Sequence, residues 1–360
     1  MQVLMKESGE KMIGNPFAIN FGTMPAQYIG REMIIEEIVN ELNAEPIQNP
    51  CFMLTGVRGT GKTVTMTAIE NRILEDDRWI VIRLNPLRDM LTGLAAKLYD
   101  RGDVISSFIT AELNLSKFGI GLNISERKPA ADIESALEKI LREIQRKKMR
   151  LLVTVDEVSG TSHMKEFASS YQLLIRQGLP VFLIMAGLYE NIHSLENENN
   201  LTFLYRTPKY EMEPLNITLI RENYQKLFNL SFEEAMEMAL ITKGYPFAYQ
   251  ALGKYVWDSE ERHLSERVLI RLDEALAHYV YNKIWSELSE MDRFYLSFLT
   301  QKESMTTAEL LELTSKKKNE FSQYRARLRD KGLIDVAVRG SITLKLPRFA
   351  EFIKQRNEFL

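Results

Sequence analysis

The sequence has little of several features that mark particular classes of protein. Its single cysteine, Cys51, cannot form a disulfide within the chain, so a reducing cytosol is the compartment we expect. With 18 glycines and 11 prolines in 360 residues, it is not a collagen-like or low-complexity chain. The longest apolar run, residues 181–189, is far shorter than the roughly 18 residues of a membrane helix, and the first twenty residues contain no signal-peptide core. We therefore expect a cytoplasmic globular protein with no membrane contact.

Charge is unevenly distributed along the chain. The net charge is −3, but residues 289–360 contain 14 Lys/Arg against 10 Asp/Glu, a net of +4, which leaves −7 for the rest. Within residues 315–348 the count is ten basic against three acidic residues. This asymmetry indicates an anionic partner for the C-terminal end alone.

The first 212 residues alternate between strand and helix patterns. Continuous apolar runs such as residues 151–155 are typical of strands buried on both faces. Period-two alternation over residues 118–124 predicts a further extended segment. The alternation as a whole predicts an α/β fold, with a parallel sheet covered by helices on both faces. The expected strands are residues 51–55, 79–84, 151–155, 180–185 and 209–212, and the expected helices are residues 31–42, 63–74, 90–99, 131–147 and 165–176.

After Pro214 the strand patterns stop and helical patterns take over. Residues 216–228, 232–242, 246–257 and 265–288 predict a small helical domain. Three more helices, at 291–300, 307–313 and 318–331, precede two strands at 333–338 and 341–346 around an Arg-Gly turn, which is a winged-helix pattern. We expect four parts: an N-terminal segment (1–26), an α/β core (27–213), a helical domain (214–288) and a winged helix (289–360).

A glycine-rich turn follows the first strand and fits the pattern G-x-x-x-x-G-K-[ST] without a mismatch. Its glycines let backbone N–H groups turn toward phosphates, and the following helix adds its N-terminal dipole. The alternative is a chance glycine-rich turn, but the strand before it and the helix after it favour a phosphate site. The residues concerned are Gly56, Val57, Arg58, Gly59, Thr60, Gly61, Lys62 and Thr63. Lys62 would contact the β- and γ-phosphates, and Thr63 would bind Mg²⁺.

Two carboxylates end the strand at residues 151–155. Asp156 would hold Mg²⁺, and Glu157 would act as the general base that polarises the attacking water. An Asp–Glu pair that caps a helix is the alternative, but the glycine-rich turn upstream (residues 56–63, the P-loop) favours an ATPase site with ATP and Mg²⁺ as cofactors.

Five segments together resemble the AAA+ superfamily: Asn15-Pro-Phe, Tyr28-Ile-Gly-Arg-Glu32, the P-loop, Asp156-Glu157 and Tyr210–Leu215. They are most similar to the archaeal and bacterial relatives of the origin-recognition clade, which end in a winged helix. The segment Gly244-Tyr-Pro-Phe-Ala248 also resembles the G-x-P segment of STAND signalling NTPases. The resemblance implies a P-loop αβα sandwich of the additional-strand type, followed by a helical lid and a winged helix.

The resemblance also implies roles for single residues. Tyr28, Ile29 and Arg31 lie where AAA+ chains contact adenine and ribose, and Arg206 lies at the arginine-finger position. In the STAND arrangement Tyr245 and Pro246 would lie beside the base. An ordinary surface arginine and an ordinary helix start with proline are the respective alternatives. The positions of the two family sensors are occupied by residues 186–188, Ala-Gly-Leu, and by Phe247, which implies slow turnover or a nucleotide switch.

The third helix of the winged helix has two distinct faces. Phe321, Tyr324 and Leu328 recur at helical spacing and are expected in the core. The opposite face carries cationic and amide side chains that suit a helix in a major groove, where amides reach base edges and arginines reach phosphates. A solvated cationic face is the alternative. The candidate DNA-binding residues are Lys318, Asn319, Ser322, Gln323, Arg325 and Arg329, with Arg339 at the turn of the wing.

Two functions follow from these patterns. The first is an AAA+ ATPase that binds double-stranded DNA through its winged helix, with ATP controlling conformation or assembly into a homo-oligomer. The second is a STAND-like switch that recruits protein partners and whose winged helix makes no DNA contact. The basic C-terminal helix favours the first, because a module that only packs needs no stripe of cations.

Overall fold

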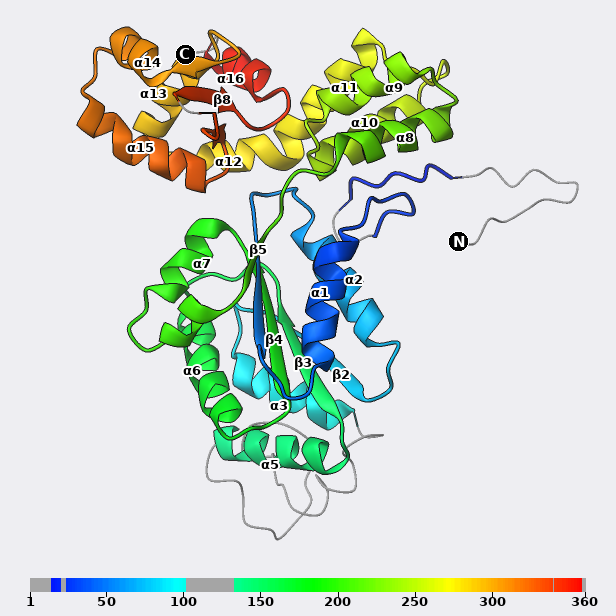
Figure 1. Cartoon of the computed structure of the whole chain (residues 1–360), viewed down its shortest axis with the longest axis vertical. Helices are drawn as coiled ribbons and strands as arrows, with labels where there is room; N and C mark the ends of the chain where they lie inside the picture. Colours follow the sequence, from blue (N-terminus) through cyan, green and yellow to red (C-terminus); the bar gives the residue numbers. More distant parts are fainter. Residues whose placement is uncertain (1–13, 21–23, 102–132, 339, 358–360) are drawn as a thin grey trace, which may run out of the picture. The chain divides into compact units, whose positions relative to one another are not determined.

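The computed structural model describes residues 14–20, 24–101, 133–338 and 340–357. These residues form two compact units (Figure 1). The sheet unit comprises residues 31–57 and 61–212, and the helical unit comprises the chain before residue 31, residues 58–60 and the chain from residue 213 onward. The extended segment expected at residues 118–124 lies outside the described residues, and the four-part division expected from the sequence stays a prediction.

A five-stranded parallel sheet forms the centre of the sheet unit. The strand order is β2-β3-β4-β1-β5, so the strand that leads into the P-loop pairs with β4 and β5. Each of the five expected strands is present, with bounds within two residues of those expected. The strands are β1 (Cys51–Thr55), β2 (Trp79–Leu84), β3 (Arg150–Val155), β4 (Val181–Gly187) and β5 (Lys209–Glu211).

Helices cover both faces of this sheet, as the sequence predicts (Figure 1). Apolar side chains from alternate positions of each central strand enter two separate clusters: Leu152 of β3 packs in one, and Leu151 and Val153 pack in the other. The continuous apolar run of β3 is explained by this burial on both faces. One layer contains α1 (Glu32–Asn43) and α2 (Lys62–Ile73); the other contains α3 (Met90–Asp100), α5 (Ile133–Arg146), α6 (Ser162–Arg176) and α7 (Tyr189–Glu196).

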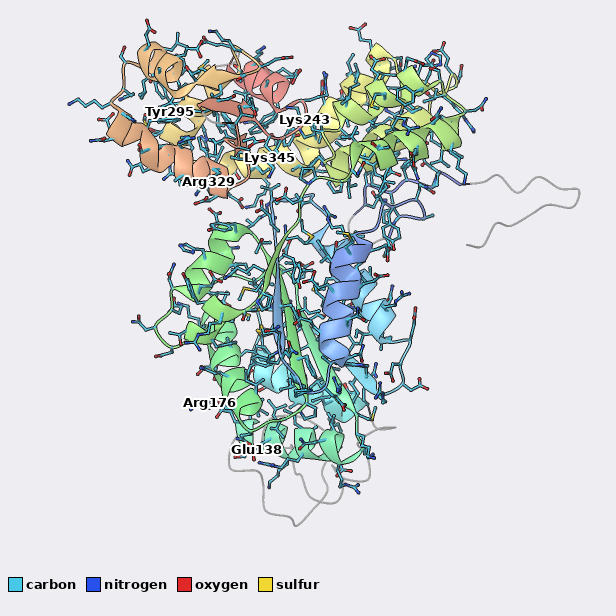
Figure 2. The ribbon with its side chains drawn as sticks, viewed as in Figure 1. Glu138, Arg176, Lys243, Tyr295, Arg329 and Lys345 are labelled. Carbon is cyan, nitrogen blue, oxygen red and sulfur yellow. The ribbon has the colours of Figure 1, made fainter. Side chains whose placement is uncertain are left out.

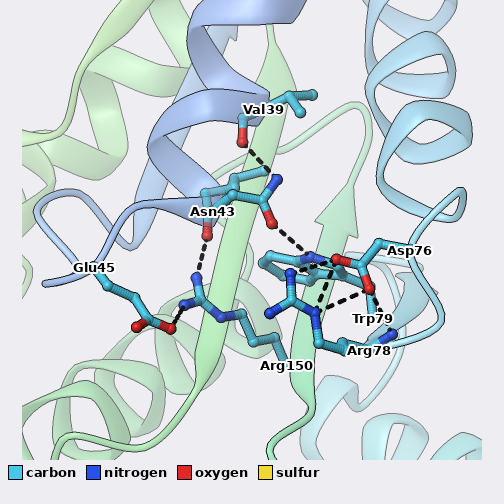
Figure 3. Close-up of polar contacts among 8 residues, drawn as sticks. Val39, Asn43, Glu45, Asp76, Arg78, Trp79 and Arg150 are labelled. Atoms are coloured by element: carbon cyan, nitrogen blue, oxygen red, sulfur yellow. Dashed lines mark hydrogen bonds and ion pairs between the residues drawn. The ribbon is translucent and has the colours of Figure 1, made fainter.

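A polar network fastens the end of α1 to the amino ends of β2 and β3 (Figure 3). The indole N–H of Trp79 donates to the Asn43 side chain over 3.1 Å. Arg150 donates to the Leu42 carbonyl, which is left without a helical partner at the end of α1, and forms an ion pair with Glu45. The network lies at the amino ends of the strands, whereas the P-loop follows the carboxyl end of β1 at the opposite edge of the sheet.

Cys51, at the start of β1, is 4% exposed, and burial raises the pKa of its thiol to about 12. Only the thiolate reacts with alkylating or disulfide reagents. We therefore expect native protein at pH 8 to resist such reagents, while protein unfolded in guanidinium reacts at the ordinary rate of a free thiol. Timed labelling followed by mass spectrometry measures both rates. Rapid labelling of the folded protein would contradict the placement of Cys51 in the core.

The helical unit begins with a bundle of helices. A single helix expected at residues 265–288 is instead a helical run with a π-helical segment in its middle, residues Ala277–Tyr281. The N–H of Asn282 bonds to the carbonyl of Ala277, five residues back, which the regular period of 3.6 does not predict. The helices are α8 (Ile217–Phe228), α9 (Phe232–Ile241), α10 (Pro246–Trp257), α11 (Glu266–Leu276) and α12 (Asn282–Ser286).

The C-terminal part of this unit has a winged-helix-like arrangement. Three helices are accompanied by a small antiparallel sheet in the order β6-β8-β7. The strand expected at residues 333–338 is only two residues long, and neither β6 nor α16 was expected from the sequence. The elements are α13 (Glu290–Leu299), β6 (Met305–Thr306), α14 (Thr307–Thr314), α15 (Lys318–Asp330), β7 (Ile334–Asp335), β8 (Ser341–Leu344) and α16 (Phe349–Asn357).

Polar contacts join the helical bundle to the winged helix within this unit. Lys243, labelled in Figure 2, follows α9 and donates to the carbonyl of Leu344 in β8 over 2.9 Å. Arg348 forms an ion pair with Asp273 of α11. No helix in the described ranges is both long and apolar enough to span a bilayer.

Candidate functional site

The P-loop connects β1 to α2, and its backbone requires glycine. Gly59 and Gly61 have φ angles of 76° and 85°, a region in which other residues are strained. Gly61 is the N-cap of α2, so the free N–H groups of the first turn of that helix face the loop. The Lys62 ammonium donates to the carbonyls of Gly56 and Val57 over 2.7 and 2.8 Å, which holds its charge at the loop. This cradle fits a chain of phosphates.

The predicted magnesium ligands lie side by side in the sheet unit. The Thr63 hydroxyl donates to the Asp156 carboxylate over 2.6 Å, although the two residues are 93 positions apart in the sequence. A hydroxyl and a carboxylate are hard oxygen donors of the kind that Mg²⁺ prefers. The two residues, next to a phosphate cradle, therefore fit a magnesium ion.

Glu157 stands at a turn with an unusual backbone. Its φ angle is 53°, its N–H donates to the Asp156 carboxylate over 2.8 Å, and its side chain is exposed. A left-handed conformation is costly for a residue other than glycine and is common at functional positions. The turn places a solvent-accessible carboxylate directly beside the predicted magnesium ligand.

The carboxyl end of β4, where the resemblance implies a polar sensor, is apolar and closely packed. Ala186 is fully buried, and a side chain at Gly187 would meet the Val158 side chain at 2.7 Å. The N–H of Val158 bonds to the Ala186 carbonyl over 2.9 Å, which fixes the chain after Glu157 against β4. Close packing therefore leaves no room for a polar sensor side chain at this position.

Arg206 ends a short 3₁₀ helix, residues Thr202–Arg206, just before β5, and its side chain is exposed. Tyr205 beside it is 74% exposed. An exposed arginine at this place is available to a neighbouring molecule.

Within the helical unit, the Gly-Tyr-Pro-Phe segment at the start of α10 contacts residues 58 and 59 of the P-loop. The buried Tyr245 hydroxyl donates to the carbonyl of Arg58, and the Phe247 N–H donates to the carbonyl of Gly59 over 3.2 Å. Burial raises the pKa of the Tyr245 hydroxyl, so this donor stays protonated. Pro246 occupies the first turn of α10, where a missing N–H costs nothing.

The entry segment before α1 is fastened to α10 in the same unit. Gln250 accepts from the Ala18 N–H over 3.0 Å and donates to the Gln27 carbonyl over 2.6 Å. Tyr28 and Ile29 follow directly and are half-buried. Arg31, also half-buried, is the N-cap of α1 in the sheet unit.

The helix α15 presents most of the candidate DNA-binding side chains to solvent. Phe321 and Leu328 are buried, as predicted, and Tyr324 is half-buried. Arg325 is half-buried, and its Nε has no hydrogen-bond partner among the described residues. The exposed side chains are Lys318, Asn319, Ser322, Gln323 and Arg329; Arg339 lies outside the described residues.

Internal contacts reduce the number of free cations on α15. Arg327, which the sequence did not single out, bonds to the buried carboxylate of Asp292 over 2.6 and 3.0 Å. Arg329 (Figure 2) pairs with its neighbour Asp330 over 2.7 Å. Sequence reasoning missed two exposed lysines, Lys316 and Lys317, directly before the helix. The unbroken run of three lysines is the signal that could have found them.

Comparisons with known proteins find a family model and similar solved structures. Residues 278–353 match a family described as "Domain of unknown function (DUF8462)". The chain is similar to the ORC2 protein of Aeropyrum pernix in its ADPNP–ADP complexes, with 14% identity, a TM-score of 0.56, and 95% of this chain and 98% of that chain covered. For Cdc6p from Pyrobaculum aerophilum the identity is 12%, the TM-score 0.49, and the coverage 94% and 97%.

A STAND protein with a tetratricopeptide repeat sensor, from Pyrococcus horikoshii, is also similar, with 14% identity, a TM-score of 0.41, and 91% of this chain and 42% of that chain covered. No curated protein matches the chain. The likeness to the A. pernix protein concerns the fold alone: a parallel five-stranded sheet between helices, followed by helices and a winged-helix-like domain.

Proposed function

We propose that this protein is an ATPase that binds double-stranded DNA through its winged helix, with bound ATP controlling its conformation or assembly. The observation that carries the ATPase part is the 2.6 Å contact between Thr63 and Asp156 beside the P-loop. The A. pernix ORC2 protein, whose fold this chain shares, was solved with ADPNP and ADP, which supports the same nucleotide class here.

Each residue of this site has a separate role in binding or hydrolysing ATP. Lys62 and the glycine-rich backbone would bind the phosphates, while Thr63 and Asp156 would hold Mg²⁺. The metal supplies positive charge that neutralises the phosphate oxygens. Glu157 takes a proton from the attacking water. Because no polar sensor stands at the end of β4, we expect turnover to be slow.

Arg206 is proposed to complete the site of a neighbouring copy. Arg206→Ala should leave the affinity for Mg·ATP unchanged and lower the turnover, by less than the roughly 10³- to 10⁵-fold that arginine fingers contribute in GTPases. Turnover per protomer of the wild type should rise with protein concentration. Arg176→Ala is the matched control, because Arg176 is another exposed arginine of the sheet unit (Figure 2). A concentration-independent rate, unaffected by Arg206→Ala, would remove the case for a shared site.

The DNA part rests on the exposed cationic and amide side chains of α15. Four phosphate contacts give a slope of about −3.6 for log affinity against log salt, since each contributes roughly −0.9. The double variant Arg325→Gln/Arg329→Gln should flatten the slope by about two units and weaken binding to all duplex sequences alike. Fluorescence anisotropy of labelled duplexes, measured from about 50 to about 300 mM KCl, gives the slope.

The matched control is Arg267→Gln/Lys354→Gln, which removes the same charge from exposed positions outside α15. If both double variants changed the slope equally, binding would reflect net charge, and α15 would not be the DNA-binding helix.

A second function, a STAND-like switch that recruits proteins, is favoured by one observation. The Gly-Tyr-Pro-Phe segment contacts the P-loop residues Arg58 and Gly59 within the helical unit, as expected if this segment reports on the nucleotide. The two functions differ in one property, which is whether the full-length protein retains duplex DNA.

A further inference from the structure

A buried carboxylate on α2 has no part in the site described so far. Glu70 is only 1% exposed, and its two oxygens contact different strands. One accepts from the Thr154 hydroxyl of β3 over 2.5 Å, and the other pairs with the Arg83 guanidinium of β2 at 2.6 Å. Arg83 and Thr154 are direct neighbours in the register of the two strands. The three side chains therefore form one connected contact between α2 and the sheet.

This contact shares its helix and its strand with the predicted magnesium ligands. Thr63 and Glu70 are seven positions apart on α2, which puts them on the same face of the helix two turns apart. Thr154 and Asp156 are two positions apart, which puts them on the same face of β3 and its extension. The helix thus meets the strand through two directional contacts, Thr63–Asp156 and Glu70–Thr154.

Apolar side chains of α2 also pack on this face of the sheet. Met66, Ile69 and Ile73 pack in the cluster that covers this face. Apolar packing is non-directional, so it resists separation of the layers better than it resists a small sliding movement. A hydrogen bond to a charged group depends on both distance and angle. The Glu70–Thr154 bond therefore defines where along β3 the helix lies, and with it the position of Thr63 relative to Asp156.

We propose that Glu70, held by Thr154 and Arg83, is a positioning residue for the magnesium site. It acts through the placement of α2 and touches neither the metal nor the nucleotide. The proposal rests on the proposed nucleotide function, because it concerns the geometry of the same site.

The test compares Thr154→Val and Glu70→Gln with the wild type in full-length protein. A fluorescent ATP analogue is titrated at fixed concentration with Mg²⁺, and its affinity is measured separately in EDTA. In both variants the Mg²⁺ concentration for half-saturation should rise about tenfold, as is typical when the support of a metal ligand is lost. Affinity in EDTA should stay within about twofold of the wild type, because the P-loop backbone is unchanged. Thr154→Ser, which keeps the hydroxyl, should show the same Mg²⁺ dependence as the wild type.

Ser170→Ala is the matched control. The buried Ser170 hydroxyl of α6 donates to the carboxylate of Glu134, so this variant also removes a hydroxyl–carboxylate bond of the sheet unit. It should lower thermal stability without changing the Mg²⁺ dependence. If Glu70→Gln fails to fold, Thr154→Val alone tests the positioning role, since valine keeps the shape of threonine in a strand.

Wild-type Mg²⁺ dependence in a folded Thr154→Val protein would overturn the positioning role and leave the proposed function standing. Failure of the wild type to bind the nucleotide would overturn both.

Discussion

Lys62→Ala is expected to weaken the binding of Mg·ATP by about 10- to 100-fold. A hydrogen bond to a charged partner is worth about 1.5–3 kcal/mol, and each 1.4 kcal/mol corresponds to a factor of about ten in affinity. Lys62 brings its charge to the loop through the Gly56 and Val57 carbonyls, and no other lysine lies within the eight residues of the P-loop. Isothermal titration calorimetry with Mg·ATP gives the two dissociation constants.

The control for this variant is Lys139→Ala, an exposed lysine of α5 in the same unit. It changes the net charge equally and should bind Mg·ATP like the wild type. Thermal unfolding of both variants without nucleotide separates loss of binding from loss of fold. An affinity of Lys62→Ala within about twofold of the wild type would show that the phosphates are not bound at this loop.

Glu157→Gln should bind Mg·ATP nearly as well as the wild type and hydrolyse it at least about 100 times more slowly. A positioned general base contributes roughly 10²–10⁴-fold to the rate, and an amide keeps the size of the carboxylate but is a very poor base. The exposed side chain at the left-handed turn after Asp156 is where this base is expected. Phosphate release under single-turnover conditions measures the hydrolysis step alone.

Glu166→Gln provides the comparison, because Glu166 is an exposed glutamate of α6 in the same unit. It should hydrolyse ATP at the wild-type rate. Hydrolysis by Glu157→Gln at the wild-type rate would mean that another group activates the water.

The sequence predicted the sheet well because local signals agree with its tertiary environment. β1 and β2 have the bounds expected from short apolar runs between turns, and α10 begins at Pro246 as its proline indicates. The P-loop could be predicted because all its residues are contiguous and each has a fixed role in phosphate binding.

Features that depend on residues far apart in the sequence could not be predicted. β6 is two residues long and exists because Met305 pairs with Ile342. The π-helical segment shifts the period of a helix whose apolar pattern looks regular. In the sequence, Glu70 resembles an ordinary glutamate on a helix surface. Only the structure shows that it contacts Thr154 and Arg83. Likewise, the charge count of α15 does not reveal that Asp292 holds Arg327.

In the proposed function, bound nucleotide controls duplex binding by the winged helix. The most direct measurement is the affinity of full-length Glu157→Gln protein, which should hold ATP without consuming it, for labelled duplex DNA at low salt with ATP or with ADP. Coupling between two binding sites is typically about 5- to 150-fold, so we predict at least about fivefold tighter binding in one nucleotide state. If the protein retains no duplex DNA in either state, the DNA-binding function is wrong and the protein-recruiting switch takes its place.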